Sequence, residues 1–258
     1  MKLTGNTMLI TGGSAGIGLA LAQKFAELGN DVIVTGRNAE KLEAAKAASS
    51  RITTVQSDAG DPEQIKALAT QMREQHPKLN VLINNAGVMF HRNLSVPTDD
   101  LTGLTAELDI NVAGPIRLVS AFIEQLKANK GTIINVSSGL AFVPLHSAPI
   151  YCATKAAIHS YSVSLRQQLA REGVEVVELM PPAVRTEMLG EVPDEGGFQI
   201  LTTDQLVQAT IKGLESGRHE IRPGQANQLH WMSRIAPGFI NAQLEKGSKS
   251  LIPPPELA

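Results

Sequence analysis

The chain has 258 residues, 43% of them hydrophobic and 19% charged, and a formal net charge of −2 at pH 7. Its 23 basic residues are scattered among 25 acidic ones without a basic block, a pattern that excludes a nucleic-acid-binding protein and an anchor on acidic membranes. Cys152 is the only cysteine, which excludes an internal disulfide and a cysteine-based metal cluster.

The amino-terminal sequence MKLTGNTMLITGG lacks the apolar stretch of a signal peptide. No segment approaches the ~18 consecutive apolar residues of a membrane-spanning helix. A chain of this length buries enough surface to fold without disulfides or metals. We therefore expect a soluble, cytoplasmic protein with no metal site and no membrane or nucleic-acid partner.

Short segments rich in β-branched residues alternate with longer amphipathic segments from the first residues almost to the end. The short segments predict strands at 8–11, 31–35, 52–57, 80–84, 132–137 and 174–179, with a shorter strand near 219–224. The longer segments predict helices at 16–28, 39–48, 62–75, 100–128, 151–171, 204–216 and 225–235. This alternation predicts an α/β fold, a single Rossmann-like, doubly wound parallel sheet of about seven strands with helices on both faces.

We expect residues 1–258 to form one domain that binds a dinucleotide and carries the catalytic site. Residues 186–204 lose the periodicity and gain Gly, Pro and acidic residues, which is typical of a lid-like substrate loop above the sheet. The tail, LIPPPELA, has no core to join and is expected to be extended.

The first predicted strand runs into the sequence TGGSAGIG at the start of the first helix. Glycines at this place let the backbone turn tightly and approach a pyrophosphate, while free N–H groups and the helix dipole attract its charge. A glycine turn alone is also compatible with an ordinary tight turn, but the strand before it and the helix after it favour a dinucleotide site. The predicted contacts are Gly12, Ser14, Gly16, Ile17 and Gly18.

The end of the second predicted strand, VTGRN, indicates which dinucleotide binds. An acidic residue at this place usually holds the free ribose 2′-hydroxyl of NAD(H). Gly36 offers no carboxylate, whereas Arg37 has a guanidinium suited to a 2′-phosphate, with the Ser14 hydroxyl as a second donor. NADP(H) is therefore favoured over NAD(H), the alternative being that Arg37 is a solvated loop residue.

Three further groups have positions suited to a cofactor. Asp58 ends the third predicted strand, where it can accept a hydrogen bond from an adenine amino group. The sequence NNAG ends the fourth, and we expect Asn85, Ala86 and Gly87 to lie against adenine and ribose. Asn111 lies inside a predicted helix, where a buried amide needs its hydrogen bonds satisfied. Each alone is compatible with a turn or a cap, but carboxyl ends of parallel strands meet at one edge of the sheet, where ligands bind.

Tyr151 and Lys155 lie one helical turn apart in the alanine-rich sequence PIYCATKAAIHSY. At this spacing two side chains share one helical face, so the ammonium can act on the phenol. A free phenol has a pKa of about 10, so acid–base work at neutral pH requires its ionised form to be favoured by about 4 kcal/mol. The ammonium and the positive nicotinamide of an oxidised cofactor, in a site poor in water, are suited to supply that.

Ser138 ends the fifth predicted strand, beside the start of this helix, where its hydroxyl can stabilise a developing alkoxide. The arrangement predicts hydride transfer between a nicotinamide and a carbonyl or secondary alcohol, with Tyr151 as general acid in one direction and general base in the other. Lys155 is also expected to hold the ribose hydroxyls, and Asn111 to anchor a water that resupplies protons. The side chains expected to line a partly apolar substrate pocket are Val143, Leu145, His146, Met188, Leu189 and Phe198.

Together these motifs resemble the short-chain dehydrogenases/reductases. The resemblance covers about residues 5–190 and consists of TGGSAGIG, Asp58, NNAG, NVAG, VSSG and YCATK, all in the family's order and spacing. It implies a catalytic tetrad of Asn111, Ser138, Tyr151 and Lys155. It also implies homodimers or homotetramers, formed partly through the helices predicted at 100–128 and 151–171. Within the family, GRHEIRPGQANQLHWMSRIAPGFIN is most similar to bacterial DltE-type oxidoreductases.

The sequence departs from the family in one place. After the sixth strand, members usually read Pro-Gly-x-Val-x-Thr, whereas this chain has Pro182 in place of the glycine. Proline fixes φ at about −65° and lacks an N–H, so we expect a differently shaped loop beside the nicotinamide. The resemblance implies that Pro181, Val184 and Thr186 contact the cofactor, the last two at its carboxamide.

The leading prediction is an NADP(H)-dependent carbonyl reductase or alcohol dehydrogenase with a small-molecule substrate. Two alternatives stay open at this point, a sensor that binds NADP(H) without turnover and an epimerase on the same machinery. A sensor needs only the glycine turn, so the presence of Ser138, Tyr151 and Lys155 favours the enzyme.

Overall fold

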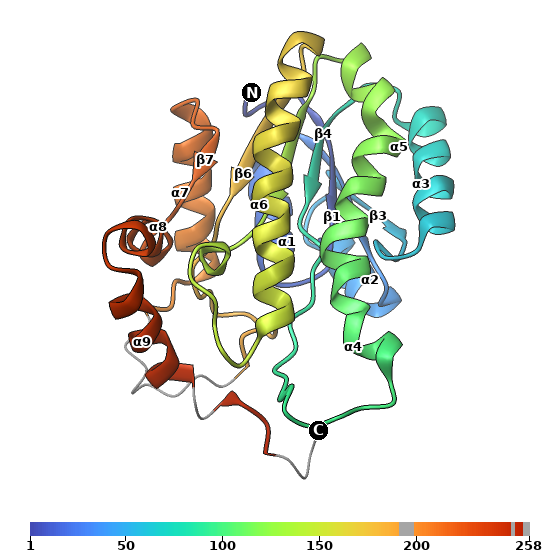
Figure 1. The fold of residues 1–258 in the computed structure, drawn as a ribbon. Helices are drawn as coiled ribbons and strands as arrows, with labels where there is room; N and C mark the ends of the chain where they lie inside the picture. Colours follow the sequence, from blue (N-terminus) through green and yellow to red (C-terminus); the bar gives the residue numbers. More distant parts are fainter. Residues whose placement is uncertain (191–198, 249–250, 255–258) are drawn as a thin grey trace.

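The computed structural model describes residues 1–190, 199–248 and 251–254. Within these residues, a seven-stranded parallel sheet has the order β3-β2-β1-β4-β5-β6-β7 (Figure 1). The strands are β1 (Thr7–Thr11), β2 (Asp31–Gly36), β3 (Ile52–Gln56), β4 (Leu79–Asn84), β5 (Thr132–Val136), β6 (Glu175–Leu179) and β7 (Glu220–Ile221). Each lies where the sequence predicts a strand, and the predicted doubly wound parallel sheet is confirmed.

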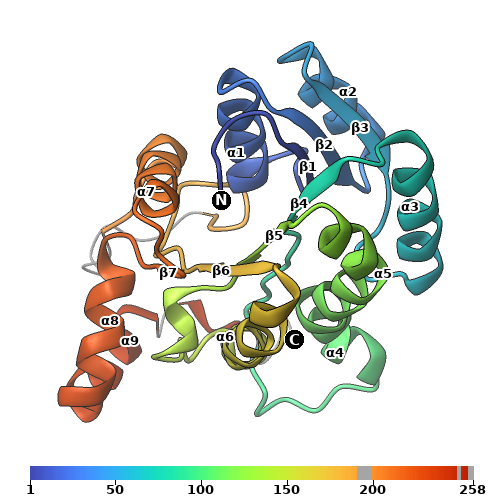
Figure 2. The same ribbon diagram turned by 90° about the horizontal axis from the view of Figure 1, so that it is seen from above.

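Helices cover the sheet on both faces (Figure 2). One face carries α1 (Gly16–Glu27), α2 (Ala39–Ala47) and α7 (Thr203–Glu215). The other carries α3 (Pro62–Gln75), α4 (Leu101–Leu108), α5 (Gly114–Ala128) and α6 (Pro149–Leu169). The last two helices, α8 (Gln225–Ile235) and α9 (Pro237–Ser248), follow β7 at the sheet edge.

The central strands are apolar without interruption because both of their faces are buried. In β1, Met8 and Ile10 belong to the core that contains Phe25 of α1, whereas Leu9 belongs to the opposite core with Phe122 of α5. Successive side chains of a strand point to opposite faces, so a strand covered on both sides needs apolar residues at every position. This burial explains the continuous apolar pattern on which the strand predictions rest.

The sheet reverses its direction of growth between β1 and β4. From β1 the chain proceeds outward to β2 and β3, and from β4 it proceeds outward in the other direction to β7. The segments that follow β1 and β4 therefore diverge, and they leave a crevice at the carboxyl ends of these strands. Ligands of doubly wound sheets bind in this crevice.

The helix predicted over 100–128 is interrupted. α4 ends at Leu108, a π-helical turn occupies Asp109–Ala113, and α5 begins at Gly114. Gly114 allows a close approach to the loop after β3, since a Cβ at this position would lie 2.4 Å from the carbonyl oxygen of Ala59. An inserted π turn leaves the apolar periodicity nearly unchanged, so the sequence pattern does not reveal it.

Helix α9 has no counterpart among the predicted helices. This helix begins at Pro237 and buries Ile240 and Leu244 on one face. A proline in the first helical turn and two apolar residues four positions apart are the only local signals for it, and both are weak.

The expectation that the tail has no core to join is also wrong for its described part, residues 251–254. Leu251 lines the cavity described below. The side-chain amide of Asn93 donates a hydrogen bond to the carbonyl of Pro253 at 3.1 Å. The tail therefore contacts the body of the protein through groups that are distant in the sequence.

The segment predicted as a loop at 186–204 is anchored at its end. α7 begins at Thr203, with Thr202 and Gln205 forming a reciprocal capping box. Just before this helix, Leu201 forms a β-bridge with Val184, and its N–H donates to the carbonyl of Ala183 at 3.0 Å. Residues 191–198 lie outside the described part of the chain.

Candidate active site

A cavity of about 800 Å³ opens at the carboxyl ends of the strands. Its walls come from the segments that follow β1 to β6 and from α6, α8 and α9. The predicted site residues in its lining are Gly12, Ser14, Gly16, Ile17, Arg37, Asp58, Asn85, Ala86, Gly87, Ser138, Tyr151, Lys155, Pro181, Val184 and Thr186. Gly18 and Asn111 do not line the cavity but lie behind its wall.

The glycine turn joins β1 to α1. Gly12 and Gly16 have φ angles of 64° and 55°, in the left-handed region that favours glycine. α1 begins at Gly16, and the preceding Ala15 offers no side-chain cap to the first helical N–H groups. Uncapped N–H groups and the positive end of the helix dipole at the cavity wall favour a bound anion.

Gly18 has a different role, which is to let α1 pack closely on the turn. A Cβ at Gly18 would lie 2.4 Å from the carbonyl oxygen of Gly12 and 2.5 Å from Nδ2 of Asn85. Because these atoms belong to a tightly connected turn, Gly18→Ala is expected to destabilise the protein by about 1–3 kcal/mol. Its melting temperature should fall by several degrees in a thermal denaturation experiment.

The matched control is Gly238→Ala on α9, where an added Cβ meets no atom within 4 Å. This substitution should leave the melting temperature unchanged or raise it, since alanine favours a helix over glycine. Equal melting temperatures for Gly18→Ala and the wild type would show that the turn accommodates a Cβ at position 18 without loss of stability.

The segment after β4 is tied to the glycine turn. Nδ2 of Asn85 donates to the carbonyls of Thr11 and Gly12 at 2.9 and 3.2 Å. Oγ1 of Thr11 accepts the N–H groups of Asn85 and Ala86, both at 3.1 Å. Thr11, which is 1% exposed, is a site-forming residue that the sequence analysis missed. Its signal is a hydroxyl at the end of an otherwise apolar strand.

Ser14, Arg37 and Asp58 come together in the cavity wall. Nη1 of Arg37, whose side chain is 63% exposed, lies 3.9 Å from Oδ2 of Asp58. The other carboxylate oxygen of Asp58 accepts the N–H of Gly60 at 2.8 Å. The Ser14 hydroxyl lies against Gly36, where a Cβ would come within 2.7 Å of Oγ. A side chain larger than glycine at position 36 would therefore displace this hydroxyl.

Lys41 is a second basic residue of this wall, and the sequence analysis missed it. It lies in the first turn of α2, which Asn38 caps by accepting the Lys41 N–H at 2.8 Å. Its ammonium lies 2.5 Å from Oε2 of Glu187, which lies in the loop after β6 and also lines the cavity. The signal for it is a basic residue one helical turn after Arg37.

Tyr151, Lys155 and Ser138 meet where β5 ends beside α6. The two α6 residues lie in its first two turns, and Nζ of Lys155 is 5.4 Å from the centre of the Tyr151 ring. Ser138 follows β5, hydrogen-bonds the Tyr151 phenol, and accepts the N–H of Leu140 at 3.1 Å. Lys155 also donates to the carbonyl of Val136 at 2.9 Å. The polar ends of all three side chains thus converge on one cavity.

Asn111 lies in the π turn and is 1% exposed. Its Oδ1 accepts the N–H of Val88 at 2.9 Å, and its Nδ2 donates to the carbonyl of Val88 at 2.8 Å and to Oγ1 of Thr154 at 3.1 Å. The amide therefore ties the segment after β4 to the turn of α6 that carries Lys155. The packing is close, since a Cβ at Gly87 would lie 3.2 Å from Oδ1 of Asn111.

Burial controls the protonation of the Tyr151–Lys155 pair. Desolvation lowers the pKa of Lys155 to about 8, opposed by the negative charge of Glu178. Desolvation also raises the pKa of Tyr151 well above its usual value, and the hydrogen bond from Ser138 offsets this only in part. Without a cofactor, burial thus outweighs the hydrogen bond, and the lowering of the Tyr151 pKa, which also requires the positive nicotinamide, stays a prediction.

The loop after β6 contains the proline that departs from the family pattern. The carbonyl of Pro181 accepts the N–H of Gly139 at 2.9 Å, and Val184 pairs with Leu201. Oγ1 of Thr186 donates to the carbonyl of Val184 at 3.3 Å. The neighbours of Pro182 therefore hold the loop beside the cavity.

The part of the cavity beyond Tyr151 is mainly apolar. Its lining includes Met89, Leu140, Leu145, Met188, Leu189, Leu229, Met232, Phe239, Ile240, Leu244 and Leu251, with polar groups from His91, Gln225, Gln228 and Gln243. Nine of these fifteen side chains come from α8, α9 and the tail, which no local pattern connects with Tyr151.

Of the side chains predicted to line the substrate pocket, Leu145, Met188 and Leu189 do so. Val143 is instead buried beneath the wall at 1% exposure, and His146 is exposed outside the cavity. Phe198 lies outside the described residues. Residues 143–146 form neither a helix nor a strand, so no regular periodicity decides which of their side chains face the cavity.

Among the residues that the structure describes, no three His, Cys, Asp or Glu side chains are grouped so as to hold a metal ion. None of the helices in the same ranges is long and apolar enough to cross a membrane.

The cavity brings together a glycine turn at the switch point of a parallel sheet and the side chains of a serine, a tyrosine and a lysine. This arrangement is that of a Rossmann-like α/β protein. The chain belongs to the short-chain dehydrogenase family, whose sequence model matches residues 6–196. It is of the DltE type, being 43% identical over 224 residues to the uncharacterized oxidoreductase DltE of Bacillus subtilis, which is 86% of this chain and 89% of the relative.

Solved structures of the family share the fold. A short-chain dehydrogenase from Burkholderia cenocepacia in complex with NADP matches with a TM-score of 0.83 and 28% identity, covering 95% of this chain and 99% of that one. The 3-ketoacyl-(acyl-carrier-protein) reductase from Brucella melitensis, complexed with NADH, matches with a TM-score of 0.75 and 25% identity, covering 82% of this chain and 91% of that one.

Proposed function

We propose that the protein binds NADP(H) and transfers a hydride between its nicotinamide and a carbonyl or secondary alcohol, with Tyr151 as general acid and base. The observation that carries this proposal is the convergence of Ser138, Tyr151 and Lys155 on the cavity that the glycine turn also lines. The complexes of two family members with NADP and NADH support a nicotinamide cofactor.

The residues in the cavity fit such a cofactor. The uncapped N–H groups at the start of α1 suit a pyrophosphate, and Gly12 lets the backbone approach it. Gly87 suits close approach of the ribose. Asp58 suits an adenine amino group, and Val184 and Thr186 suit the carboxamide. When bound, NADP(H) would supply or accept the hydride, and its oxidised form would add a positive charge beside the phenol.

In carbonyl reduction, the Tyr151 hydroxyl donates its proton to the substrate oxygen, which Ser138 holds by a hydrogen bond. The raised pKa of Tyr151 keeps the phenol protonated in the free protein, which is the form that reduction requires. Lys155, with a pKa of about 8, is mostly charged at neutral pH and stabilises the phenolate that remains. In alcohol oxidation the same groups act in reverse.

Asn111 supports this chemistry from behind the wall. By holding Val88 and Thr154 it positions the segment after β4 relative to the α6 turn that carries Lys155. Its Oδ1 has capacity for one more hydrogen bond, so we retain the proposal that it anchors a water for proton resupply.

We further propose an apolar substrate, because the cavity beyond Tyr151 is lined mainly by Leu, Met and Ile side chains. The test is a panel of aldehydes, ketones and secondary alcohols, followed at the nicotinamide absorbance with NADPH or NADP⁺. In a series of methyl ketones, kcat/KM should rise about threefold to fourfold for each added methylene. Hydroxylated ketones of equal length, the matched controls, should lose this gain. Tight NADPH binding without turnover of any member of the panel would contradict the enzyme and indicate a sensor.

The preference for NADP(H) depends on Arg37. Arg37→Ala is expected to weaken NADPH binding about 10- to 100-fold and to leave NADH binding nearly unchanged, since a charge-assisted hydrogen bond contributes about 1.5–3 kcal/mol. Parallel fluorescence titrations with the two cofactors measure both affinities. Arg51→Ala, which removes a similarly exposed arginine paired with Asp31, should change neither. Equal or tighter binding of NADH to the wild type would disprove this role of Arg37.

We also propose that the protein acts in the cytoplasm as a homodimer or homotetramer. Exposed apolar side chains on α4, α5 and α6, namely Leu108, Ile116 and Val163, support association through these helices.

A further inference from the structure

β6, next to the edge strand β7, carries a buried carboxylate. Glu178 is 0% exposed and lies between Val177 and Leu179, which are also fully buried. Burial of an unpaired carboxylate costs several kcal/mol, so a charge at this position requires partners. The identity of these partners indicates what Glu178 does.

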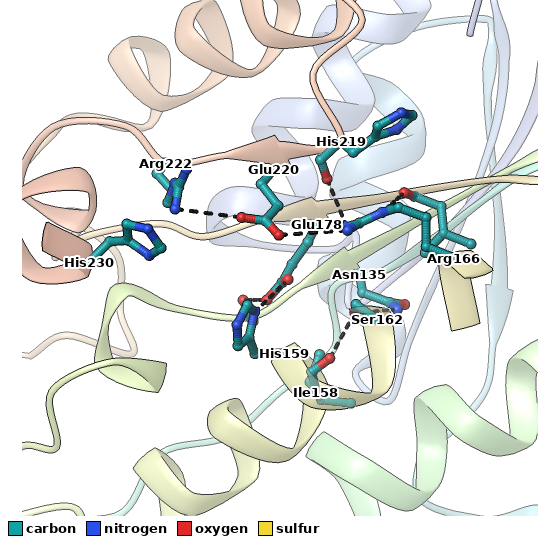
Figure 3. A network of polar contacts seen from close by, with 12 residues as sticks. Asn135, Ile158, His159, Ser162, Arg166, Glu178, His219, Glu220, Arg222 and His230 are labelled. Atoms are coloured by element: carbon teal, nitrogen blue, oxygen red, sulfur yellow. Dashed lines mark hydrogen bonds and ion pairs between the residues drawn. The ribbon is translucent and has the colours of Figure 1, made fainter. Parts of the chain in front are cut away.

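Glu178 is held by two donors (Figure 3). The Ser137 hydroxyl donates to Oε1 at 2.5 Å, and Nδ1 of His159 on α6 lies 2.9 Å from Oε2. An ionised carboxylate only accepts hydrogen bonds, so the proton lies on Nδ1 of His159. The hydrogen bond to Glu178 raises the pKa of His159. Both carboxylate oxygens are therefore satisfied.

These contacts fix the end of β5 residue by residue. The carbonyl of Val136 accepts a hydrogen bond from Nζ of Lys155 at 2.9 Å. The side chain of Ser137 binds Glu178. The side chain of Ser138 hydrogen-bonds the Tyr151 phenol. The Ser137 N–H also donates to the carbonyl of Leu179, beside Glu178, at 2.9 Å. Ser138 thus stands one residue beyond a side chain that Glu178 holds.

The charge of Glu178 also acts on Lys155, where it opposes the effect of burial on the lysine pKa. Other charged or titratable groups face this region from the neighbouring elements. Figure 3 shows Arg166 on α6, Glu220 and Arg222 at β7, and His230 on α8. Arg234, on the same helix, contacts His230. Glu220 pairs in register with Glu178, but its carboxylate lies 3.6 Å from Arg166 and 3.5 Å from Arg222. Its charge is therefore compensated locally, whereas that of Glu178 reaches the lysine.

We propose that Glu178 is a positioning residue of the hydride-transfer site, which holds Ser138 in place through Ser137 and stabilises the Lys155 ammonium beside Tyr151. The inference rests on the proposed function, because it assigns a role relative to that reaction. It adds a further buried polar group to the site, from a strand that carries none of the motif residues.

Glu178→Gln tests the charge, since glutamine keeps the volume and an acceptor for Ser137. The loss of the negative charge should move the alkaline limb of the kcat/KM profile for ketone reduction to lower pH by about one unit. The pH at which NADPH affinity begins to fall should move in the same direction, and this readout requires no turnover. Glu220→Gln, the register-paired carboxylate, is the control and should leave both profiles in place.

If both pH profiles of Glu178→Gln superimpose on those of the wild type, the proposed role of Glu178 is refuted. The proposed hydride transfer would not be affected by that result. NADPH binding without turnover by the wild type would instead refute the proposed function, while the pH dependence of binding would still test Glu178. If Glu178→Gln does not fold, Ser137→Ala replaces it. The alanine variant should lose about tenfold in kcat with NADPH affinity unchanged, and an unchanged kcat would refute the positioning role.

Discussion

Replacement of Tyr151 by phenylalanine is expected to abolish turnover and to leave the fold and NADPH binding intact. The tyrosine ring packs with Val143, Leu145 and Ile240, and phenylalanine preserves those contacts. Only the hydroxyl is lost, and with it the proton donor next to the substrate oxygen. Because general acid catalysis contributes about 10²- to 10⁴-fold, kcat should fall by about three orders of magnitude.

Single-turnover absorbance of the nicotinamide measures this loss, and fluorescence titration checks that NADPH still binds. Tyr161→Phe is the matched control, because it alters the other of the two tyrosines in the chain. Tyr161 packs against the core beneath α3 and α5, away from the cavity. Its variant should retain turnover within about twofold of the wild type. A Tyr151→Phe variant that retains a tenth of the wild-type rate would rule out the tyrosine as the proton donor.

Lys155→Met is expected to lose activity and to gain stability. Methionine fills a similar volume but removes the charge that stabilises the phenolate, so kcat should fall by at least about 10²-fold. In the folded protein, burial lowers the pKa of Lys155 from 10.5 to about 8, which corresponds to a cost of about 3 kcal/mol for the charged form at neutral pH. Loss of the hydrogen bond from Lys155 to Val136 destabilises the variant by about 1 kcal/mol. The variant should therefore be about 2 kcal/mol more stable than the wild type.

The gain in stability should depend on pH in a defined direction. Lys155 binds its proton more weakly in the folded chain than in the unfolded one, so the wild-type protein gains stability as the pH rises from about 8 to 10.5. The advantage of Lys155→Met is therefore full below pH 8 and disappears toward pH 10.5. Urea denaturation at several pH values measures it, with the exposed Lys66→Met as the control, whose stability difference should not vary with pH. A variant less stable than the wild type at pH 7 would show that the buried ammonium is a net stabiliser.

Much of the site is predictable from sequence because its parts follow consecutive strands. Gly12, Asp58 and Ser138 are far apart in the chain, but each stands just after a β-strand, and parallel strands end at one edge of the sheet. The spacing of Tyr151 and Lys155 requires only that one helix be continuous, and α6 is. For these residues, local periodicity and chain order are sufficient to predict proximity.

Other features depend on contacts that no local pattern reports. Helix α9 becomes part of the cavity wall because Ile240 and Leu244 pack against a segment some hundred residues earlier, and Leu251 of the tail lines the same cavity. Glu178 reads in sequence as a polar interruption of an apolar strand. Its significance emerges only when β5 and α6 place Ser137 and His159 against it.

The amino-acid sequence by itself determined the parallel sheet, the dinucleotide crevice and the identity of the polar residues around it, since each of these follows from periodicity and spacing along the chain. The tertiary structure decided how those residues are charged. Desolvation and through-space electrostatics set the pKa of Tyr151 and of Lys155, and both depend on the depth of packing and on neighbours from other strands. Helical spacing predicted that the two side chains meet, but the effect of burial, which raises the pKa of Tyr151 in the free protein, follows only from the tertiary structure.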